Sequence, residues 1–367
     1  MKRNSYINYR SGLILGIAFF GLVAKADETG VLYTMDNAAG ANHVLVFHRD
    51  ANGNLVNAGS IETGGTGLGT GLSSQGSVIL SRDGNWLFAC NAGSSEITVL
   101  RASGGSVAAT DKVASGGRMP VSLAMRNNLV YALNAGGGAG DVDTVTAFIF
   151  ANGKLLALPD STRTLSAANT GPAQVSFSRN GDALIVTERV TSLIDVFSMD
   201  EDGLTTLHKT FPSVGATPFG FDVSRDDRVF VSEAQNSTAS YYSLSPEGNL
   251  AVISGAVPTH QSAACWLIAS RDGRFVYTAN AGSGSISGFR VGKDGSLQAI
   301  SPDGRTGVIG DGSHPVDMAQ SRDGRFLYSL ANGNGTLVGF RVMPNGSLDP
   351  LNVVSGIPTS AAGLAGQ

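Results

Sequence analysis

Hydrophobic residues occur along the chain in short runs separated by polar turns, and no long stretch shows the 3.6-residue period of an amphipathic helix. The segment from Cys265 to Asn280, CWLIASRDGRFVYTAN, holds two such runs around the turn Ser-Arg-Asp-Gly. Two apolar runs around an Asp-Gly turn predict a β-hairpin. A third run, ISGFRV, follows at Ile286 to Val291, and a turn KDGSL precedes a fourth. The unit is therefore expected to contain four antiparallel strands.

This unit repeats along the chain. The tetrapeptide SRDG begins at Ser81, Ser270 and Ser321, with variants at Ser178 and Ser224 and a degenerate copy at Arg126, so that successive copies lie about 45 to 52 residues apart. Four strands in each such period are typical of a β-propeller blade. Seven second strands can be counted, beginning at Val31, Trp86, Leu129, Ala183, Arg228, Phe275 and Phe326. The sequence predicts an all-β, seven-bladed propeller.

The first of these second strands has no hairpin partner before it. The C-terminal segment Ser355 to Gln367, SGIPTSAAGLAGQ, matches the lead-in to blade three at Ser115 to Asn127. We therefore expect the C-terminus to supply the innermost strand of blade one and to close the ring, which removes the exposed strand edges. In this register Cys90 and Cys265 fall on well-separated blades, so two free thiols are expected.

The N-terminal 26 residues have the pattern of a secretory signal peptide. Lys2, Arg3 and Arg10 precede an apolar run from Leu13 to Ala24, which ends in Ala-Lys-Ala. The run is shorter than the roughly 20 residues that a membrane-spanning helix needs, although a retained anchor is the alternative. The expected organisation is a signal peptide at 1–26 and one propeller domain at 27–367, located in the periplasm or secreted, with no stable membrane span after cleavage.

Composition agrees with strands and tight turns, since glycine accounts for 49 residues and only 15% of the chain is charged. The net charge is −4, and removal of the basic signal segment makes it more negative. Without a cluster of Lys and Arg, a nucleic-acid partner is not expected. We expect a monomer.

A repeat allows residues that serve the scaffold to be separated from residues that depart from it. The last residue of the second strand is Asn or Asp in four blades, which fits turn capping, but it is Glu188 and Glu233 in two adjacent blades. If both carboxylates face the channel mouth, they predict a cation site or an acid and base pair. Asn134 and Asn280 would complete an oxygen-rich set for a divalent cation such as calcium. The alternative is a structural ion pair with Arg189 or Arg118.

A second polar ring is expected on the innermost strands, four residues before each turn. It includes Gln174, Trp266 and Asp317, which should reach the channel because alternate residues of these strands are apolar. The alternative is that every propeller channel is hydrated and polar, and this interpretation applies more to the serines of the ring than to Gln174, Trp266 and Asp317. His314 and Arg118 lie in loops that lead into innermost strands, and His314 is close in sequence to Asp317. No nucleophile elbow and no Walker loop is present.

The repeats SRDGRFVYTANAGSGSISGFRVGKDGSL and SRDGRFLYSLANGNGTLVGFRVMPNGSL, with GPAQVSFSRNGDALIVTER and ATPFGFDVSRDDRVFVSEA, resemble the lactonase-type propellers. That family includes one class of 6-phosphogluconolactonases and the carboxymuconate cyclases. The resemblance implies opening or closing of a lactone at the channel mouth, with acidic, His and Arg groups handling a carboxylate-bearing substrate. It puts forward Glu188, Glu233, His314 and Arg189 as catalytic residues.

Two functions follow as hypotheses. The first is an exported lactonase that opens an unphosphorylated lactone at the channel mouth, with Gln174, Trp266, Asp317 and Arg118 binding the substrate. A carboxylate or His would act as general base on water, and an arginine or a bound cation would stabilise the oxyanion. The second is a non-catalytic propeller that binds a protein or a glycan on its top face, because this fold serves many binding functions.

Overall fold

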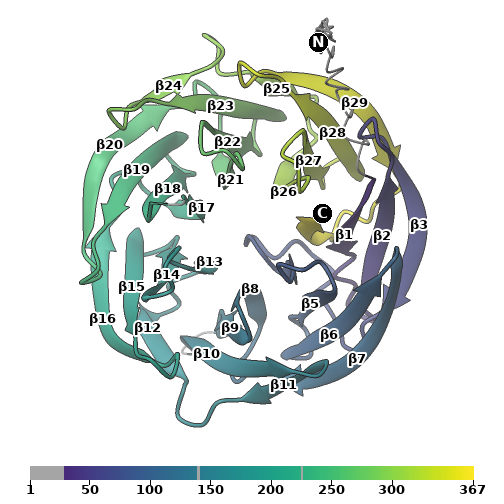
Figure 1. Cartoon of the computed structure of the whole chain (residues 1–367), viewed down its shortest axis with the longest axis vertical. Helices are drawn as coiled ribbons and strands as arrows, with labels where there is room; N and C mark the ends of the chain where they lie inside the picture. The colour runs from purple at the N-terminus through teal and green to yellow at the C-terminus, as the bar shows by residue number, and fades with distance from the viewer. Residues whose placement is uncertain (1–28, 139–140, 225) are drawn as a thin grey trace, which may run out of the picture.

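The computed structural model describes residues 29–138, 141–224 and 226–367, and in this part thirty strands form seven sheets arranged as a ring (Figure 1). Every sheet is antiparallel and has four strand positions, and in two sheets the outermost position is divided between two short strands. The predicted seven-bladed propeller is confirmed. None of the described residues forms a helix long and apolar enough to cross a membrane. The expected signal peptide at 1–26 lies outside the described residues.

The two inner strands of each blade carry most of the core. The second strands are buried along nearly their whole length, because they lie between two other strands and both of their faces pack against neighbouring sheets. The innermost strands are β4 (Val78–Leu80), β8 (Pro120–Arg126), β13 (Pro172–Phe177), β17 (Pro218–Val223), β21 (Ala264–Ala269), β26 (Pro315–Gln320) and β30 (Ala362–Gly366). The second strands are β1 (Gly30–Met35), β5 (Trp86–Asn91), β9 (Leu129–Asn134), β14 (Ala183–Glu188), β18 (Arg228–Glu233), β22 (Phe275–Asn280) and β27 (Phe326–Ala331).

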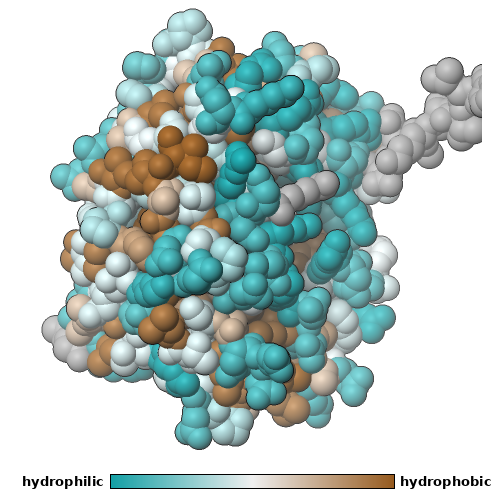
Figure 2. Space-filling model, turned by 60° about the vertical axis from the view of Figure 1, so that its left-hand side comes forward, coloured by the Kyte–Doolittle hydropathy of each residue, from teal (hydrophilic) through white to brown (hydrophobic). Residues whose placement is uncertain are grey.

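The outer strands are more exposed, and the outermost ones place polar side chains and single hydrophobic ones such as Val56 and Leu207 in solvent. Figure 2 shows one side of the molecule, where hydrophobic groups are interspersed with hydrophilic ones. The third strands are β2 (His43–Arg49), β6 (Glu96–Ser103), β10 (Val142–Ala151), β15 (Leu193–Met199), β19 (Thr238–Leu244), β23 (Ser285–Val291) and β28 (Thr336–Val342). The outermost strands are β3 (Leu55–Glu62), β7 (Ser106–Ala114), β11 (Lys154–Ala157) with β12 (Arg163–Ala168), β16 (Thr205–Pro212), β20 (Leu250–Pro258), β24 (Leu297–Ala299) with β25 (Gly307–Val308), and β29 (Leu348–Ser355).

The repeated Ser-Arg-Asp-Gly turn joins the innermost strand to the second strand. In blade six the Ser270 hydroxyl donates to Asp272 Oδ1 at 2.7 Å and accepts from the backbone N–H of Phe275 at 2.9 Å. Gly273 has a φ of 72°, the left-handed region that glycine adopts without steric cost. Serine, aspartate and glycine are therefore fixed by the geometry of the turn.

Neighbouring blades are joined by apolar packing and by a repeated tyrosine contact. Tyr277 and Tyr328 are fully buried on second strands, and their hydroxyls donate to the carbonyls of Gly346 and Gly53 at 3.0 and 2.8 Å. Each of these glycines lies in the turn between the third and outermost strands of the next blade. The second contact runs from blade seven to blade one and so helps to close the ring.

The ring is closed by the C-terminus, as predicted. The strand β30 pairs antiparallel with β1, so that Tyr33 lies opposite Ala365 and Met35 opposite Ala362. The Thr34 hydroxyl adds a hydrogen bond of 2.6 Å to the carbonyl of Gly363. In Figure 1 the C-terminus lies beside β1 near the inside of the ring. Cys90 and Cys265 are free and buried, which confirms the expected thiols.

Candidate functional site

The channel at the centre of the ring has two different ends. Along each innermost strand the chain runs from a loop end, where the chain enters from the preceding blade, to the Ser-Arg-Asp-Gly turn. We call the two ends the loop face and the hairpin-turn face. The sequence pattern predicts a site at the loop face.

Residues 71–77, which lead into β4, cross the channel on the side of the loop face, and we call them the plug. The Gln75 side chain crosses to β21, where its Nε2 donates to the Leu267 carbonyl at 2.7 Å and its Oε1 accepts from the Leu267 N–H at 3.0 Å. The Ser74 hydroxyl donates to the carbonyl of Val121, and the Ser74 carbonyl accepts from the indole N–H of Trp266. The plug is thus bonded to blades three and six.

The position of the plug depends on a glycine in blade five. A Cβ atom at Gly220 would lie 2.2 Å from Gln75 Oε1 and 2.7 Å from the Leu267 nitrogen. Any other residue at position 220 would therefore displace the Gln75 amide. Figure 1 shows the dark blue segment that precedes β5 reaching toward the middle of the ring.

Beyond the plug, the channel contains a cavity of about 440 Å³ toward the hairpin-turn face. Its wall is formed by the innermost strands of blades one to five and seven together with Gln75 and Gly76. The polar and charged side chains on this wall include Gln174, Asp222, Asp317, Arg126 and Arg179. We call this space the channel cavity.

Asp317 is the most buried acid of the channel cavity, with 2% of its surface exposed. Its Oδ2 accepts from the backbone N–H of Gly76 at 3.1 Å, and its Oδ1 accepts from its neighbour Met318 at 2.9 Å. Burial raises the pKa of Asp317 to about 7, against the lowering effect of these backbone donors. An acid with such a pKa exchanges a proton near neutral pH, as a general base must.

Asp222, on β17, is the second acid of the channel cavity. Its Oδ2 accepts from the backbone N–H of Ala269 in blade six at 2.8 Å, and its Oδ1 accepts from Val223 at 2.8 Å. Burial raises the pKa of Asp222, while the charges of Arg271 and Arg179 and the backbone donors lower it. The cavity therefore combines two acids of raised pKa with arginine groups.

Of the expected polar ring, the structure brings Gln174 and Asp317 together on the channel cavity wall. The Gln174 amide is itself bonded in both directions to the backbone of Phe221, with distances of 2.9 and 2.7 Å. Trp266 packs against Phe219, with ring centroids 4.7 Å apart, and lines a separate cavity of about 70 Å³ beside the plug. Asp317 lines both cavities.

Glu188 and Glu233 are not brought to a shared cavity, which corrects the expectation that they face the channel mouth. Both are fully buried, and neither lines a cavity identified in the described residues. Glu188 accepts from the Ser166 N–H at 3.0 Å and from the Ser166 and Thr191 hydroxyls. Glu233 accepts from the Gly215 N–H at 2.9 Å and from the Ser213 and Thr238 hydroxyls.

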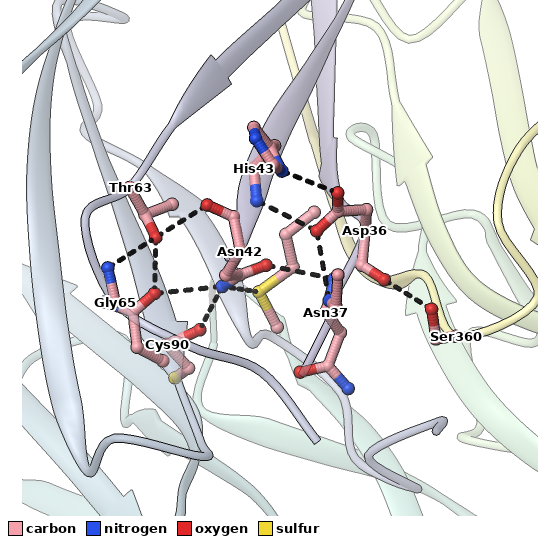
Figure 3. A network of polar contacts seen from close by, with 11 residues as sticks. Asp36, Asn37, Asn42, His43, Thr63, Gly65, Cys90 and Ser360 are labelled. Atoms are coloured by element: carbon pink, nitrogen blue, oxygen red, sulfur yellow. Dashed lines mark hydrogen bonds and ion pairs between the residues drawn. The ribbon is translucent and has the colours of Figure 1, made fainter. Parts of the chain in front are cut away.

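The same strand-end position forms comparable contacts in other blades. In blade two Asn91 Oδ1 accepts from Asn42 Nδ2 at 2.9 Å and from the Thr63 hydroxyl at 2.7 Å, both in or beside the preceding blade. Figure 3 shows this network, in which Asn42 also donates to the Cys90 carbonyl and Asp36 of blade one contacts His43. These strand-end residues join one blade to the next. We call such contacts interblade joints.

The set suggested for a cation is likewise not assembled. The Asn134 amide donates to the Ser115 carbonyl and the Thr144 hydroxyl, and the Asn280 amide donates to Ser285 and Ser287. With Glu188 and Glu233 also bonded to hydroxyls of their own joints, the four residues do not fit one shared cation. No group of three or more His, Cys, Asp or Glu residues suited to a metal occurs in the described part of the chain.

The remaining predicted residues lie at the loop face and apart from the channel cavity. Arg189 stacks over the Phe219 ring at 5.5 Å, and its Nε donates to the Gly171 carbonyl at 2.9 Å. Burial lowers the pKa of Arg189, and nearby Cys265 and Asp143 oppose that effect. Arg118 is exposed and pairs with Asp141 at 3.0 Å. His314 is exposed in the loop before β26.

Sequence reasoning missed Asp222, Gln75, Arg126 and Arg179 as channel groups. Asp222 carried a usable signal, because it stands two residues before the turn serine where other blades have Ile79, Ile268 or Ala319. Gln75 carried none, since its partner Leu267 lies 192 residues away in sequence. Arg126 and Arg179 stand at the repeated turn, so their positions in the sequence do not distinguish them from scaffold residues.

Comparison with known proteins supports the observed fold. The model of a family described as "Lactonase, 7-bladed beta-propeller" matches residues 27–148, 139–251 and 231–354. No curated protein sequence matches the chain.

Solved structures with this architecture share little sequence with the chain. A candidate 6-phosphogluconolactonase from Bacteroides uniformis is 19% identical with a TM-score of 0.74, covering 91% of this chain and 99% of its own. The periplasmic gluconolactonase PpgL of Pseudomonas aeruginosa is 18% identical with a TM-score of 0.72, covering 92% and 99%. Virginiamycin B lyase from Staphylococcus aureus is 13% identical with a TM-score of 0.52, covering 75% and 82%. Likeness at these identities establishes the fold.

Proposed function

Because the chain belongs to the family of seven-bladed lactonase β-propellers, we propose that it hydrolyses a lactone in the channel cavity. The observation that carries the proposal is the pair of acids of raised pKa, Asp317 and Asp222, on the wall of one cavity that also holds arginine groups. The cavity volume of about 440 Å³ lies within the range of small-molecule sites. Because the plug crosses the channel on the side of the loop face, we expect substrate to enter from the hairpin-turn face.

Asp317 is proposed as the general base. Its carboxylate takes a proton from water as the water oxygen bonds to the lactone carbonyl carbon. Negative charge then develops on the carbonyl oxygen, and the positive field of Arg126 and Arg179 at the cavity wall favours it. The ring C–O bond breaks, and the proton held by Asp317 passes to the ring oxygen. The product is a hydroxy acid.

The plug also positions the proposed base. The Gly76 N–H holds Asp317 Oδ2, so the bond to the plug fixes one oxygen of the carboxylate. The Gln75 amide is held at both ends by Leu267 and keeps this backbone in place. We therefore assign the plug the role of excluding solvent from the loop face and orienting Asp317.

The test is hydrolysis of a panel of aliphatic, sugar and aryl lactones. In Asp317→Asn we expect kcat/KM to fall by about 100-fold or more, because the base is removed while the side-chain shape is kept. The double variant Glu188→Gln, Glu233→Gln serves as the control, and its folded protein should retain turnover. Undiminished turnover in Asp317→Asn, or loss of turnover in the folded control alone, would refute this assignment of the site.

We further propose that the protein is exported and acts on an unphosphorylated lactone. The N-terminal sequence pattern supports export, and a gluconolactonase with this fold is periplasmic in Pseudomonas aeruginosa. Expression of the full chain should give a periplasmic or secreted protein beginning after Ala26, and glucono-1,5-lactone should be turned over faster than its 6-phosphate. N-terminal sequencing that finds only intact protein in the cytoplasm would contradict export.

A further inference from the structure

Among the residues that the structure describes, Asp317 is the one shared by the channel cavity and the cavity beside the plug. We call the second of these, with its volume of about 70 Å³, the side cavity. The rest of its wall comes from the plug, from Trp266 of β21, from the turn after β27 and from the start of β30. The proposed base therefore separates two spaces that have no other lining residue in common.

The side cavity has room for water and no room for a lactone. Sites that hold small organic molecules have volumes of about 300 Å³ or more, whereas a water molecule in the liquid occupies about 30 Å³. A volume of about 70 Å³ therefore accommodates roughly two water molecules. The lactone is left to the channel cavity, with its volume of about 440 Å³.

The wall of the side cavity contains a buried acceptor without a partner. Asn332 donates from Nδ2 to the Ala361 carbonyl at 2.9 Å, while its Oδ1 is buried and accepts no hydrogen bond from any described residue. A purely apolar cavity stays dry, whereas a cavity with several polar partners holds water. The side cavity belongs to the second kind, because Asn332 and Asp317 both line it.

The Asp317 carboxylate has capacity for one more hydrogen bond. Its backbone donors are the N–H groups of Gly76, Met318 and Leu364. An ionised carboxylate has about four acceptor sites, so that one site is left over. A water molecule in the side cavity can donate to this site, and the other hydrogen of such a water can be donated to Asn332.

The side cavity is lined at its outer end by residues of the loop face. Gly71 and Ser73 of the plug belong to its wall and are exposed at the surface of the protein. The side cavity thus extends from the loop face to Asp317. The lactone is expected from the opposite, hairpin-turn face, so the two reactants would approach the base from different sides.

A separate space for water has a chemical use. A lactone that fills the channel cavity displaces the water in it, yet each hydrolysis consumes one water molecule that the base must hold close to the carbonyl carbon. A base with substrate on one side and water on the other meets both needs.

We propose that the side cavity holds the water consumed in hydrolysis and that Asn332 positions this water against Asp317. In each turnover the water gives its proton to Asp317 and its oxygen to the lactone carbonyl carbon, and another water molecule enters from the loop face. The inference rests on the proposed lactone hydrolysis and adds the source of its second reactant.

The kinetic test compares two substitutions of Asn332 that remove the same amide. Asn332→Leu and Asn332→Ala both lose the hydrogen bond to the Ala361 carbonyl, but leucine keeps the space filled with apolar groups and alanine leaves more room for water. With the lactone that the unmodified protein hydrolyses fastest, kcat of Asn332→Leu should fall about tenfold and KM should change less than about twofold, because substrate binding is untouched. Asn332→Ala should keep kcat within about threefold of the unmodified value. Equal losses of kcat in the two variants would show a structural role and overturn the proposal.

A second measurement detects the water without turnover. Trp266 lines the side cavity and is one of only two tryptophans, so its indole N–H signal is readily distinguished. Water-selective NMR of the unmodified protein should show magnetisation transfer from a long-lived water molecule to this indole group, and weaker transfer in Asn332→Leu. Absence of the transfer in the unmodified protein would overturn the proposal, even where lactone is hydrolysed or where Asn332→Leu does not fold. Transfer without any lactone turnover would refute the hydrolysis, and with it the supply of water, and leave only a hydrated cavity.

Discussion

The interblade joints around Glu188 and Glu233 and the channel cavity around Asp222 and Asp317 both contain a pair of acids from different blades, yet their environments differ. Each glutamate accepts hydrogen bonds from one backbone N–H, one serine hydroxyl and one threonine hydroxyl, and neither lines a cavity identified among the described residues. The aspartates accept only backbone N–H groups and line an open volume. An acid that departs from a repeat is therefore no indicator of chemistry until its partners are known.

Removal of β30 would disrupt both the interblade joints and the channel cavity, because it opens the ring. We expect it to have the largest effect on stability. Deletion of residues 358–367 removes β30, which pairs with β1 and contributes Leu364 and Ala365 to the cavity wall. The inner edge of β1 would then be left without a partner strand. We expect loss of a single cooperative unfolding transition in thermal denaturation. A melting curve unchanged from that of the full chain would show that β30 does not close the ring.

Truncation of a side chain in an interblade joint should lower the stability of the protein and leave lactone hydrolysis unchanged. Glu188→Ala leaves the Ser166 N–H and the Ser166 and Thr191 hydroxyls without their acceptor in a buried position. Loss of such partners costs about 3 kcal/mol in the free energy of unfolding, which urea denaturation measures. Glu188→Gln, which keeps one acceptor oxygen, should cost less.

The folded fraction of Glu188→Ala should hydrolyse lactone with an unchanged kcat/KM, because the joint does not touch the cavity. Loss of activity without loss of stability would reverse the comparison and restore Glu188 as a catalytic residue.

Most of the architecture could be predicted from the sequence, because the spacing of the Ser-Arg-Asp-Gly turns fixes the number of blades and the C-terminal segment matches a known innermost strand. The second strands from Trp86 onward begin where they were predicted, and β1 begins one residue earlier at Gly30. The contacts within each blade are local in sequence and recur with the repeat. They can therefore be recognised from a single sequence.

The site was predicted only in part. Gln174 and Asp317 were identified because period-two alternation points them into the channel. Glu188 and Glu233 were misplaced because their hydroxyl partners, such as Ser166 and Ser213, lie in segments whose approach is set by packing between blades. The plug was not foreseen, since the contact of Gln75 with Leu267 spans the ring and depends on Gly220 in a third blade. A contact among three blades does not recur with the repeat, so the sequence pattern does not predict it.

The central claim is that Asp317 acts as the base within the channel cavity, and the pH dependence of kcat/KM tests it most directly. Burial raises the pKa of Asp317 to about 7, and a general base works only when deprotonated, so kcat/KM should be low in acid and rise with pH through about 7 to a plateau. In Asp317→Asn this rise should be absent from any residual activity. A profile that is flat across neutral pH, or that keeps the same midpoint in Asp317→Asn, would contradict the account.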